Sequence, residues 1–158
     1  MRVPKIYLET SVFNFYFADD APEKKQDTLK LFEEIDQGKY EPYISDYVFL
    51  ELRRATEPKQ SQMITLTERY GVTLLELNVE ADRLAQVYVD EGIIPAKHFV
   101  DAAHIATATI HDLDFIVSFN FQHIVKRKTV TMTESVNLRE GYKRIGIFSP
   151  TEVIESDE

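Results

Sequence analysis

The sequence predicts an α/β fold in three layers, with a mostly parallel central sheet of about five strands and helices on both faces. Strand-like and helix-like segments alternate along the chain, which is typical of a parallel sheet connected by helices. The strand-like runs are continuously apolar rather than alternating, as expected for strands covered by helices on both sides. The chain has 158 residues, which suits one domain of ordinary size.

The first half of the chain supplies the expected elements in alternation. A β-rich run at residues 5–8 predicts the first strand, and apolar residues at helical spacing predict a helix over residues 23–37, before Gly38. A short strand is expected at residues 43–44. Ser45 or Asp46 can cap a helix that runs to Arg54.

Proline and glycine residues divide the remainder of the chain. A helix is expected between Pro58 and Gly71, followed by a strand at residues 72–77 and a helix over residues 81–91. The next helix, residues 99–111, is apolar nearly all round, which predicts burial. The last expected elements are a strand at 115–117, a weaker helix at 133–142 and a strand at 145–148.

Composition and charge exclude several classes of protein. There are no cysteines, which removes disulfides, thiolate metal sites and cysteine nucleophiles. Lys and Arg number 18 against 27 Asp and Glu, and the net charge of −9 argues against binding nucleic acid or anionic membranes through overall charge. No secretory signal or membrane-length apolar run is present, so a cytoplasmic protein with no membrane partner is expected. No glycine follows the first strand, which argues against a nucleotide cofactor.

Domain organisation is expected to be simple. One domain is expected over residues 1–154, because no internal repeat or low-complexity tract interrupts the chain. The acidic residues 155–158 are expected to form a disordered tail.

Polar side chains gather where the expected strands end. Ligands in such sheets bind beyond the carboxyl ends of the strands. Glu9 follows the first strand, and Glu51 lies in the helix after the second. Asp101 is a carboxylate near the start of the apolar helix, where burial is unfavourable unless a partner compensates. The sequence therefore predicts three carboxylates at one sheet edge, with Asn120 nearby.

Carboxylates gathered in this way need a cation. Two of them about 4 Å apart repel by about 4 kcal/mol at an effective dielectric constant near 20. Carboxylate oxygens suit Mg²⁺ or Mn²⁺, and such ions are used in phosphodiester hydrolysis.

Four segments in this order carry a family resemblance. They read YLETSVFN at 7–14, SDYVFLEL at 45–52, DAAHIA at 101–106 and VSFNFQHI at 117–124. Together they resemble the PIN domain, most closely the VapC-type toxin ribonucleases of prokaryotic toxin–antitoxin pairs. The resemblance covers essentially the whole chain.

The resemblance implies a Rossmann-like three-layer nuclease fold and a metal-dependent endoribonuclease. It implies that Mg²⁺ or Mn²⁺ is held by Glu9, Glu51, Asp101 and Asn120, which form the catalytic set. Thr10 and Ser118 are expected to hydrogen-bond these carboxylates or a phosphate. Implied partners are an RNA substrate, an antitoxin protein and a second copy of the chain in a homodimer.

Two positions depart from the family pattern. Glu9 stands where Asp is usual, and the extra methylene displaces the carboxylate by about 1 Å, a shift that can lower a rate on the order of 100-fold. Asn120 stands where many members carry Asp, and it brings no charge. The alternative interpretation is therefore a catalytically weak or inactive PIN-like scaffold that binds RNA or a protein.

A second metal hypothesis rests on histidines in the apolar helix. His98, Asp101 and His104 recur every third residue on one broad helix face, with His111 further along. Imidazole and carboxylate together suit Zn²⁺ or Fe²⁺. The competing interpretation makes His98 a helix-end residue and His104 a packed core imidazole.

Two further segments leave alternatives open. Lys126 and Arg127, with Lys128, form either a basic patch for RNA beside the site or an ordinary solvated cluster. The aromatic residues at 13–17 form either core or a surface for a dimer or antitoxin.

Overall fold

Five parallel strands form the centre of the molecule, in the order β3-β2-β1-β4-β5. The computed structural model describes residues 2–155. The register pairs Tyr7 of β1 with Tyr43 of β2 on one side and with Ile116 of β4 on the other. The strands are β1 (Lys5–Leu8), β2 (Glu41–Ser45), β3 (Thr73–Leu75), β4 (Phe115–Val117) and β5 (Gly146–Phe148).

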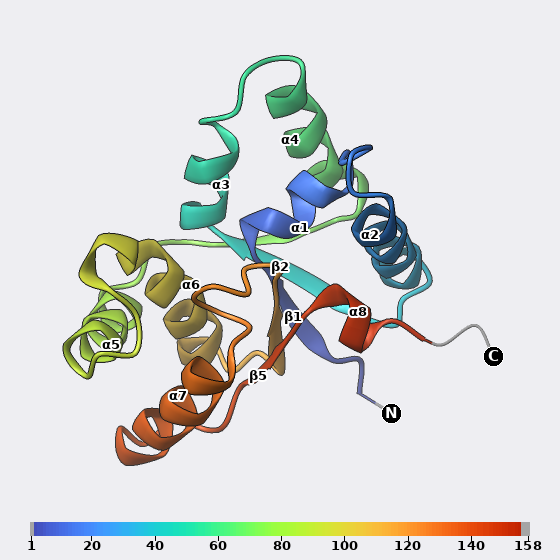
Figure 1. The fold of residues 1–158 in the computed structure, drawn as a ribbon. Coiled ribbons are helices and arrows are strands. Elements are labelled where there is room, and N and C mark those ends of the chain that lie inside the picture. The colour runs from blue at the N-terminus through green and yellow to red at the C-terminus, as the bar shows by residue number, and fades with distance from the viewer. Residues whose placement is uncertain (1, 156–158) are drawn as a thin grey trace.

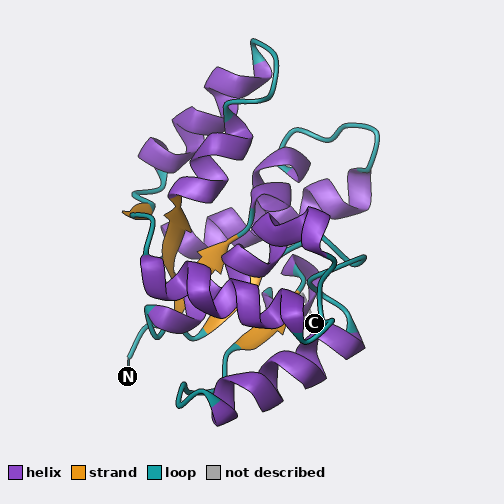
Figure 2. Ribbon diagram, turned by 90° about the vertical axis from the view of Figure 1, so that its left-hand side faces the viewer, coloured by secondary structure: helices purple, strands orange, loops and turns teal. Residues whose placement is uncertain are grey.

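Helices cover both faces of this sheet, which confirms the predicted three-layer α/β fold. Figure 1 shows α2 and α8 on one side of the sheet and α5, α6 and α7 on the other. Figure 2, turned by 90°, shows the strands enclosed by helices. The helical elements are α1 (Thr10–Phe15), α2 (Pro22–Asp36), α3 (Asp46–Leu52), α4 (Lys59–Arg69), α5 (Val79–Asp90), the 3₁₀ turn η1 (Ala96–His98), α6 (Phe99–Ile110), α7 (Arg127–Arg139) and α8 (Pro150–Val153).

The core lies where β1 and α6 cross the middle of the fold. Ile6, Tyr7 and Leu8 of β1 are fully buried, as predicted for a central strand. The predicted burial of α6 is also confirmed, since every residue from Ala102 to Thr109 is buried. Its small alanines allow α5 to pack closely along it. Among the described residues, no helix is both long and apolar enough to cross a bilayer.

Helix α7 differs most from the sequence expectation, because it begins at Arg127 instead of residue 133. Threonines have low helix propensity, so residues 129–133 read as a loop. In the fold, Thr129 and Thr133 are buried, and the Thr129 hydroxyl donates to the carbonyl of His123 at 2.7 Å. Tertiary burial therefore extends the helix against its local propensity.

The short helices that follow β1 and β5 also escaped sequence prediction. Helix α1 follows β1 directly, and α8 follows β5 after Ser149, which forms a capping box with Glu152. Just after α8, Glu155 donates its backbone N–H to the carboxylate of Glu34, with 3.1 Å between nitrogen and oxygen. The Glu155 carboxylate lies 2.8 Å from the ammonium nitrogen of Lys39. The remainder of the expected disordered tail, residues 156–158, lies outside the described residues.

Candidate active site

The carboxyl ends of β1, β2 and β4 lie side by side at one edge of the sheet. Along the chain, β2 and β3 are added on one side of β1, and β4 and β5 are added on the other side. The direction in which strands are added therefore reverses between β1 and β4. Such a switch point is where α/β sheets place their ligands. Glu9 follows β1, Ser118 follows β4, and α3 with Glu51 follows β2.

Glu9 is held in place by three hydrogen bonds to a single oxygen. Its Oε1 accepts from the backbone N–H of Ser11 at 3.2 Å, from the Ser11 hydroxyl at 2.5 Å and from the Ser118 hydroxyl at 2.6 Å. The first of these bonds makes Glu9 the N-cap of α1, where a negative charge also interacts favourably with the helix dipole. Glu9 is 5% exposed, so its position is set by these donors.

Glu51 is held in the same manner by donors from two other elements. Its Oε1 accepts from the Thr10 hydroxyl of α1 at 2.6 Å and bonds Nε2 of His104 on α6 at 2.7 Å. His104 is fully buried, while the Glu51 side chain is 28% exposed. Glu51 therefore links three helices at the sheet edge.

The two partners in this pair shift each other's protonation. Burial raises the pKa of Glu51, but the hydrogen bonds from His104 and Thr10 and the charge of Arg54 lower it below its ordinary value overall. Burial lowers the pKa of His104, but the bond to Glu51 and the nearby Glu9 and Asp101 raise it above its ordinary value overall. Both shifts favour a carboxylate facing an imidazolium.

The other face of His104 is anchored in the core. Its Nδ1 lies 2.6 Å from the Tyr7 hydroxyl, which lies 2.7 Å from the Ser45 hydroxyl. The Ser45 hydroxyl in turn accepts a hydrogen bond from the backbone N–H of Tyr47, so Ser45 is the N-cap of α3. Of the two caps that the sequence allowed, Ser45 and Asp46, the structure uses Ser45. Burial raises the pKa of Tyr7 well above its usual range, so the phenol keeps its proton. Both imidazole nitrogens of His104 are therefore engaged.

Asp101 lies in the first turn of α6 and is mostly buried, with a side chain 14% exposed. Burial raises its pKa, and the nearby His104, a hydrogen bond from Asn120, and His123 offset only part of that rise. Asn120 Oδ1 accepts the backbone N–H of His123 at 2.9 Å. Since that oxygen already accepts a hydrogen bond, Asn120 donates to Asp101 from its side-chain NH₂ group.

The histidines group differently from the sequence hypothesis. His104 joins Glu9 and Glu51, whereas His98 and Asp101 are joined by His123 from the turn after β4; in each group the potential ligand atoms lie within 4.8 Å of one another. We call these the Glu9–Glu51 cluster (Glu9, Glu51, His104) and the His98–His123 cluster (His98, Asp101, His123).

Sequence reasoning missed four contributors, namely Tyr7, Ser11, His104 as a carboxylate partner, and His123. The sequence did contain a signal for Ser11, which directly follows Glu9 and Thr10. It also contained one for Tyr7, which lies in the first predicted strand, two residues before Glu9. His123 had no signal in sequence spacing, because only the β4–α7 turn brings it to α6.

The donor set of the Glu9–Glu51 cluster fits a hard divalent cation. In both glutamates Oε1 carries the hydrogen bonds, while Oε2 has no hydrogen-bond partner among residues 2–155. Oxygen ligands pre-oriented by hydrogen bonds to their other atoms are typical of Mg²⁺ and Mn²⁺ sites. Glu9 and Glu51 could hold such an ion directly.

Basic residues lie near this edge of the sheet. Lys126 is the N-cap of α7 and, with Lys128, lines a hollow of about 350 Å³ that also includes Gln122 and His123. Arg127 begins α7. The hollow adjoins the His98–His123 cluster through His123.

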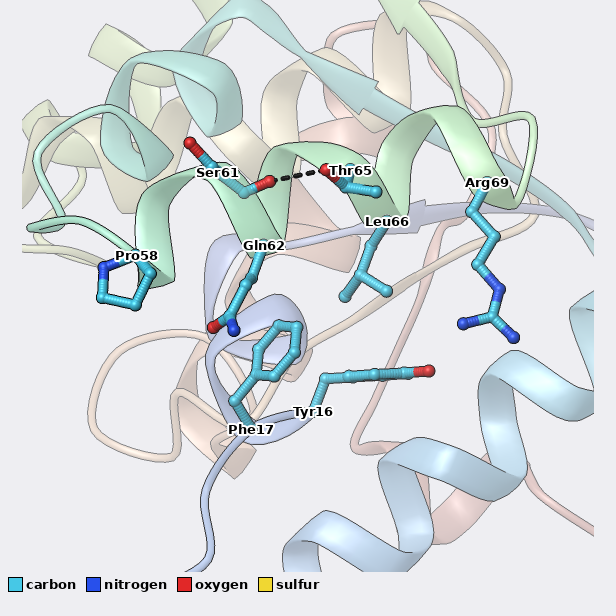
Figure 3. A pocket seen from close by; sticks show the side chains of 8 residues that line it. All are labelled: Tyr16, Phe17, Pro58, Ser61, Gln62, Thr65, Leu66 and Arg69. Atoms are coloured by element: carbon cyan, nitrogen blue, oxygen red, sulfur yellow. Dashed lines mark hydrogen bonds between the residues drawn. The ribbon is translucent and has the colours of Figure 1, made fainter.

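The aromatic segment after β1 divides between core and surface. Phe13 is fully buried and meets Phe32 of α2 edge to face at 5.9 Å. Phe15 packs on Phe119 at 4.6 Å. Tyr16 and Phe17 instead line an apolar groove of about 370 Å³ against α4. Figure 3 shows both rings facing α4, with Pro58 at one end and Arg69 at the other.

Comparison with known proteins agrees with the fold. The PIN domain family matches residues 6–127. A solved structure titled as VapBC2 from Rickettsia felis bound to a DNA fragment from its promoter has a similar fold, with a TM-score of 0.51 and 15% identity over 73% of this chain and 88% of that chain. No curated protein matches. Since the family match spans most of the sequence and includes the carboxyl ends of β1, β2 and β4, which carry the site, the chain belongs to the PIN domain family.

Proposed function

We propose that this protein is a metal-dependent endoribonuclease that acts in the cytoplasm, as the toxin of a toxin–antitoxin pair. The observation that supports it most is the arrangement of Glu9 and Glu51. Their Oε1 atoms are hydrogen-bonded, whereas their Oε2 atoms have no protein partner among the described residues. Membership of the PIN domain family supports nuclease chemistry at this place.

The residues of the site take the following proposed roles. Glu9 and Glu51 hold the cation, and Asp101, which the structure groups with His98 and His123, is proposed as a third carboxylate beside them. Asn120 is proposed as a weak outer ligand that also orients Asp101. Thr10 and Ser118 fix the carboxylates through their hydroxyls. A bound Mg²⁺ or Mn²⁺ would supply Lewis-acid activation of water and of the phosphodiester.

Contacts with RNA are proposed along two features beside the carboxylates. Lys126 and Arg127 at the start of α7 would meet phosphates. Phe121 is 49% exposed and, with Phe15 and Phe119, surrounds the ammonium group of Lys24 at 5.0–6.0 Å, so a base could stack there. Substitution Lys126→Gln is expected to reduce the salt dependence of RNA affinity, whereas Lys59→Gln on α4 serves as the control.

The decisive experiment is RNA cleavage by the purified chain with and without Mg²⁺ or Mn²⁺. Activity is expected only with the metal, and Asp101→Asn is expected to abolish it. The control is Asp90→Asn, an exposed acidic side chain on α5 that accepts a hydrogen bond from Gln86. Metal-dependent cleavage by Asp101→Asn at the parent rate would refute the assignment.

Calorimetric titration with Mn²⁺ distinguishes the nuclease proposal from the alternative of an inactive scaffold. Glu9 and Asn120 motivate it, because both depart from the family pattern. A scaffold without a metal site would give no Mn²⁺ heat above that of Asp101→Asn. The nuclease proposal predicts a measurable difference.

An antitoxin is the proposed protein partner, and the groove between α1 and α4 is its proposed docking surface. Tyr16, Phe17 and Leu66 offer apolar contacts there, and Arg69 offers a cation at one end. An amphipathic segment with one acidic residue near its end fits this chemistry. The product of the adjacent reading frame is the test ligand, and Phe17→Glu is expected to abolish its binding without altering the helical circular dichroism signal.

Homodimer formation is also proposed. The edge strand β3 and the residues after it expose apolar side chains, with Leu74 46%, Leu77 54% and Val79 86% exposed. Light scattering after gel filtration is expected to give twice the monomer mass, and Leu77→Ser to reduce it to that of the monomer.

A further inference from the structure

A second group of potential metal ligands lies at the start of α6. His98 closes η1 and is the N-cap residue of α6, Asp101 lies one turn further on, and His123 comes from the turn between β4 and α7. His98 Nδ1 lies 3.9 Å from Asp101 Oδ2. The two imidazole rings lie 4.0 Å apart between centroids, tilted by 34°. Three elements thus bring two imidazoles and a carboxylate to one point.

The imidazoles of this cluster lack the partners that occupy His104. The Nε2 atom of His123 is buried without a hydrogen-bond partner among the residues that the structure describes. No side-chain hydrogen bond forms at His98 within the same residues, only the longer contact with Asp101. Buried polar atoms without partners are rare in folded proteins and call for an explanation.

The chemistry of these atoms differs from that of the two glutamates. Neutral imidazole with one carboxylate suits Zn²⁺ and similar transition metals, and Mg²⁺ prefers oxygen. Bonds of about 2.0–2.2 Å place two ligands of a tetrahedral ion roughly 3.3 Å apart. The present spacing, within 4.8 Å, therefore requires only small side-chain rotations.

We propose that His98, Asp101 and His123 form a second cation site that selects a transition metal such as Zn²⁺ over Mg²⁺. The site adjoins the Glu9–Glu51 cluster and takes Asp101 as its only carboxylate. This proposal goes beyond the proposed function, because it concerns binding of a different class of metal and holds whether or not the chain cleaves RNA.

The test is isothermal calorimetry on the full chain with Zn²⁺ alone and with Mg²⁺ alone. The parent is expected to bind Zn²⁺ more tightly than Mg²⁺. His98→Gln and His123→Gln are each expected to lower Zn²⁺ affinity by at least about tenfold, the smaller effect known for residues that only support a ligand. Mg²⁺ affinity is expected to stay within about twofold in both variants. Unchanged Zn²⁺ affinity in both would overturn the site.

His111→Gln is the matched control, because His111 lies at the other end of α6 and its buried Nε2 also has no partner within residues 2–155. Among the same residues His111 belongs to no group of three potential ligands, so the Zn²⁺ affinity of His111→Gln should match that of the parent. An equal loss in His111→Gln would show that the effect is not specific to the cluster. Circular dichroism of each variant establishes that it is folded.

Glu51→Gln separates this proposal from the proposed function. It is expected to weaken Mg²⁺ binding and to leave Zn²⁺ binding in place. The reverse pattern, Zn²⁺ lost with Glu51→Gln but kept with His98→Gln, would place Zn²⁺ on the glutamates and refute the second site. Visible absorption of bound Co²⁺ gives an independent readout, since loss of an imidazole ligand changes its spectrum.

Discussion

The two histidine-containing clusters lie at the same edge of the sheet but use their imidazoles in opposite ways. In the Glu9–Glu51 cluster, His104 is fully buried and bonds Tyr7 through Nδ1 and Glu51 through Nε2. In the His98–His123 cluster, the His98 side chain is 36% exposed and His123 Nε2 has no hydrogen-bond partner among residues 2–155. One imidazole supports a carboxylate, and the other two remain available as ligands.

This difference shows that proximity of ligand types does not define a metal site. The atoms of both clusters lie within 4.8 Å of one another. What distinguishes them is which atoms already have partners. In the first cluster the unpartnered atoms are carboxylate oxygens, which suit a hard cation, whereas in the second they include imidazole nitrogen, which suits a softer one.

The largest contrast is expected in stability. His104→Ala removes the imidazole that bonds both Tyr7 and Glu51, and these two groups keep only Ser45 and Thr10, respectively. Because the buried pair with Glu51 is broken, we expect the free energy of unfolding to fall by about 3–5 kcal/mol. His98→Ala removes a half-exposed side chain and should change it by less than about 0.5 kcal/mol. Urea denaturation followed by circular dichroism measures both. Equal losses would contradict the distinction between a supporting and an available imidazole.

The next effect concerns carboxylate placement. Glu9→Asp restores the usual family residue but withdraws the carboxylate by about 1 Å from the donors Ser11 and Ser118, so RNA cleavage should fall on the order of 100-fold. Asp90→Glu, a one-methylene change at an exposed position on α5, is the control for chain length. A Glu9→Asp variant as active as the parent would show that the serine hydroxyls do not set the position.

A smaller effect is expected when one donor is removed. Ser118→Ala takes away the 2.6 Å hydrogen bond to Glu9 and the acceptor for the backbone N–H of Asn120. Mn²⁺ affinity should fall about tenfold, as for other residues that support a metal ligand. Calorimetry measures it, with Thr65→Val on the surface of α4 as the control. Zn²⁺ affinity should not fall with it, because the Ser118 hydroxyl bonds Glu9 and Asn120 and, among the described residues, hydrogen-bonds neither histidine.

The smallest effect provides a pH reference remote from both clusters. Arg2 donates two hydrogen bonds to Asp114, the first cause that lowers the pKa of that carboxyl to about 2. Because the pKa of Asp114 is lower in the folded state, the carboxylate stabilises the protein at pH values above the unfolded pKa of about 3.9. This stabilisation is lost as the pH falls toward about 2.

Asp114→Asn should therefore destabilise by less than about 1 kcal/mol at neutral pH, and the difference from the parent should shrink between about pH 4 and pH 2. Thermal unfolding across this range measures it. A difference that grows as pH falls would show that the ion pair does not cause the shift.

The fold was predictable because its signals are local. Continuous apolar strands, the apolar helix α6 and the positions of Gly38, Gly71 and Gly92 all reflect burial and turn geometry that neighbouring residues set. Each of these three glycines has a positive φ after a helix, a conformation that glycine adopts at little cost. The start of α7 was missed, because burial of Thr129 and Thr133 overrides their weak propensity.

The candidate site was predictable in part. Glu9, Glu51 and Asp101 could be named because Glu9 directly follows a strand, Glu51 lies in the short helix after the next strand, and Asp101 lies in the first turn of an apolar helix. The role of His104 could not, since its helical spacing from Asp101 suggested a shared ligand set, while the packing of α6 against α3 turns it to Glu51.

By itself, the sequence determined the α/β class, the order of the strands and longer helices, and the acidic character of the sheet edge, because all three follow from local hydrophobic pattern and from where strands end. Only the tertiary structure decided which atoms of those residues are occupied. Tyr7, Thr10 and Ser118 come from segments up to 109 residues away from the groups that they bond. Hydrogen bonds over such separations depend on how helices and strands pack, and that packing assigns one imidazole to Glu51 and leaves two beside Asp101.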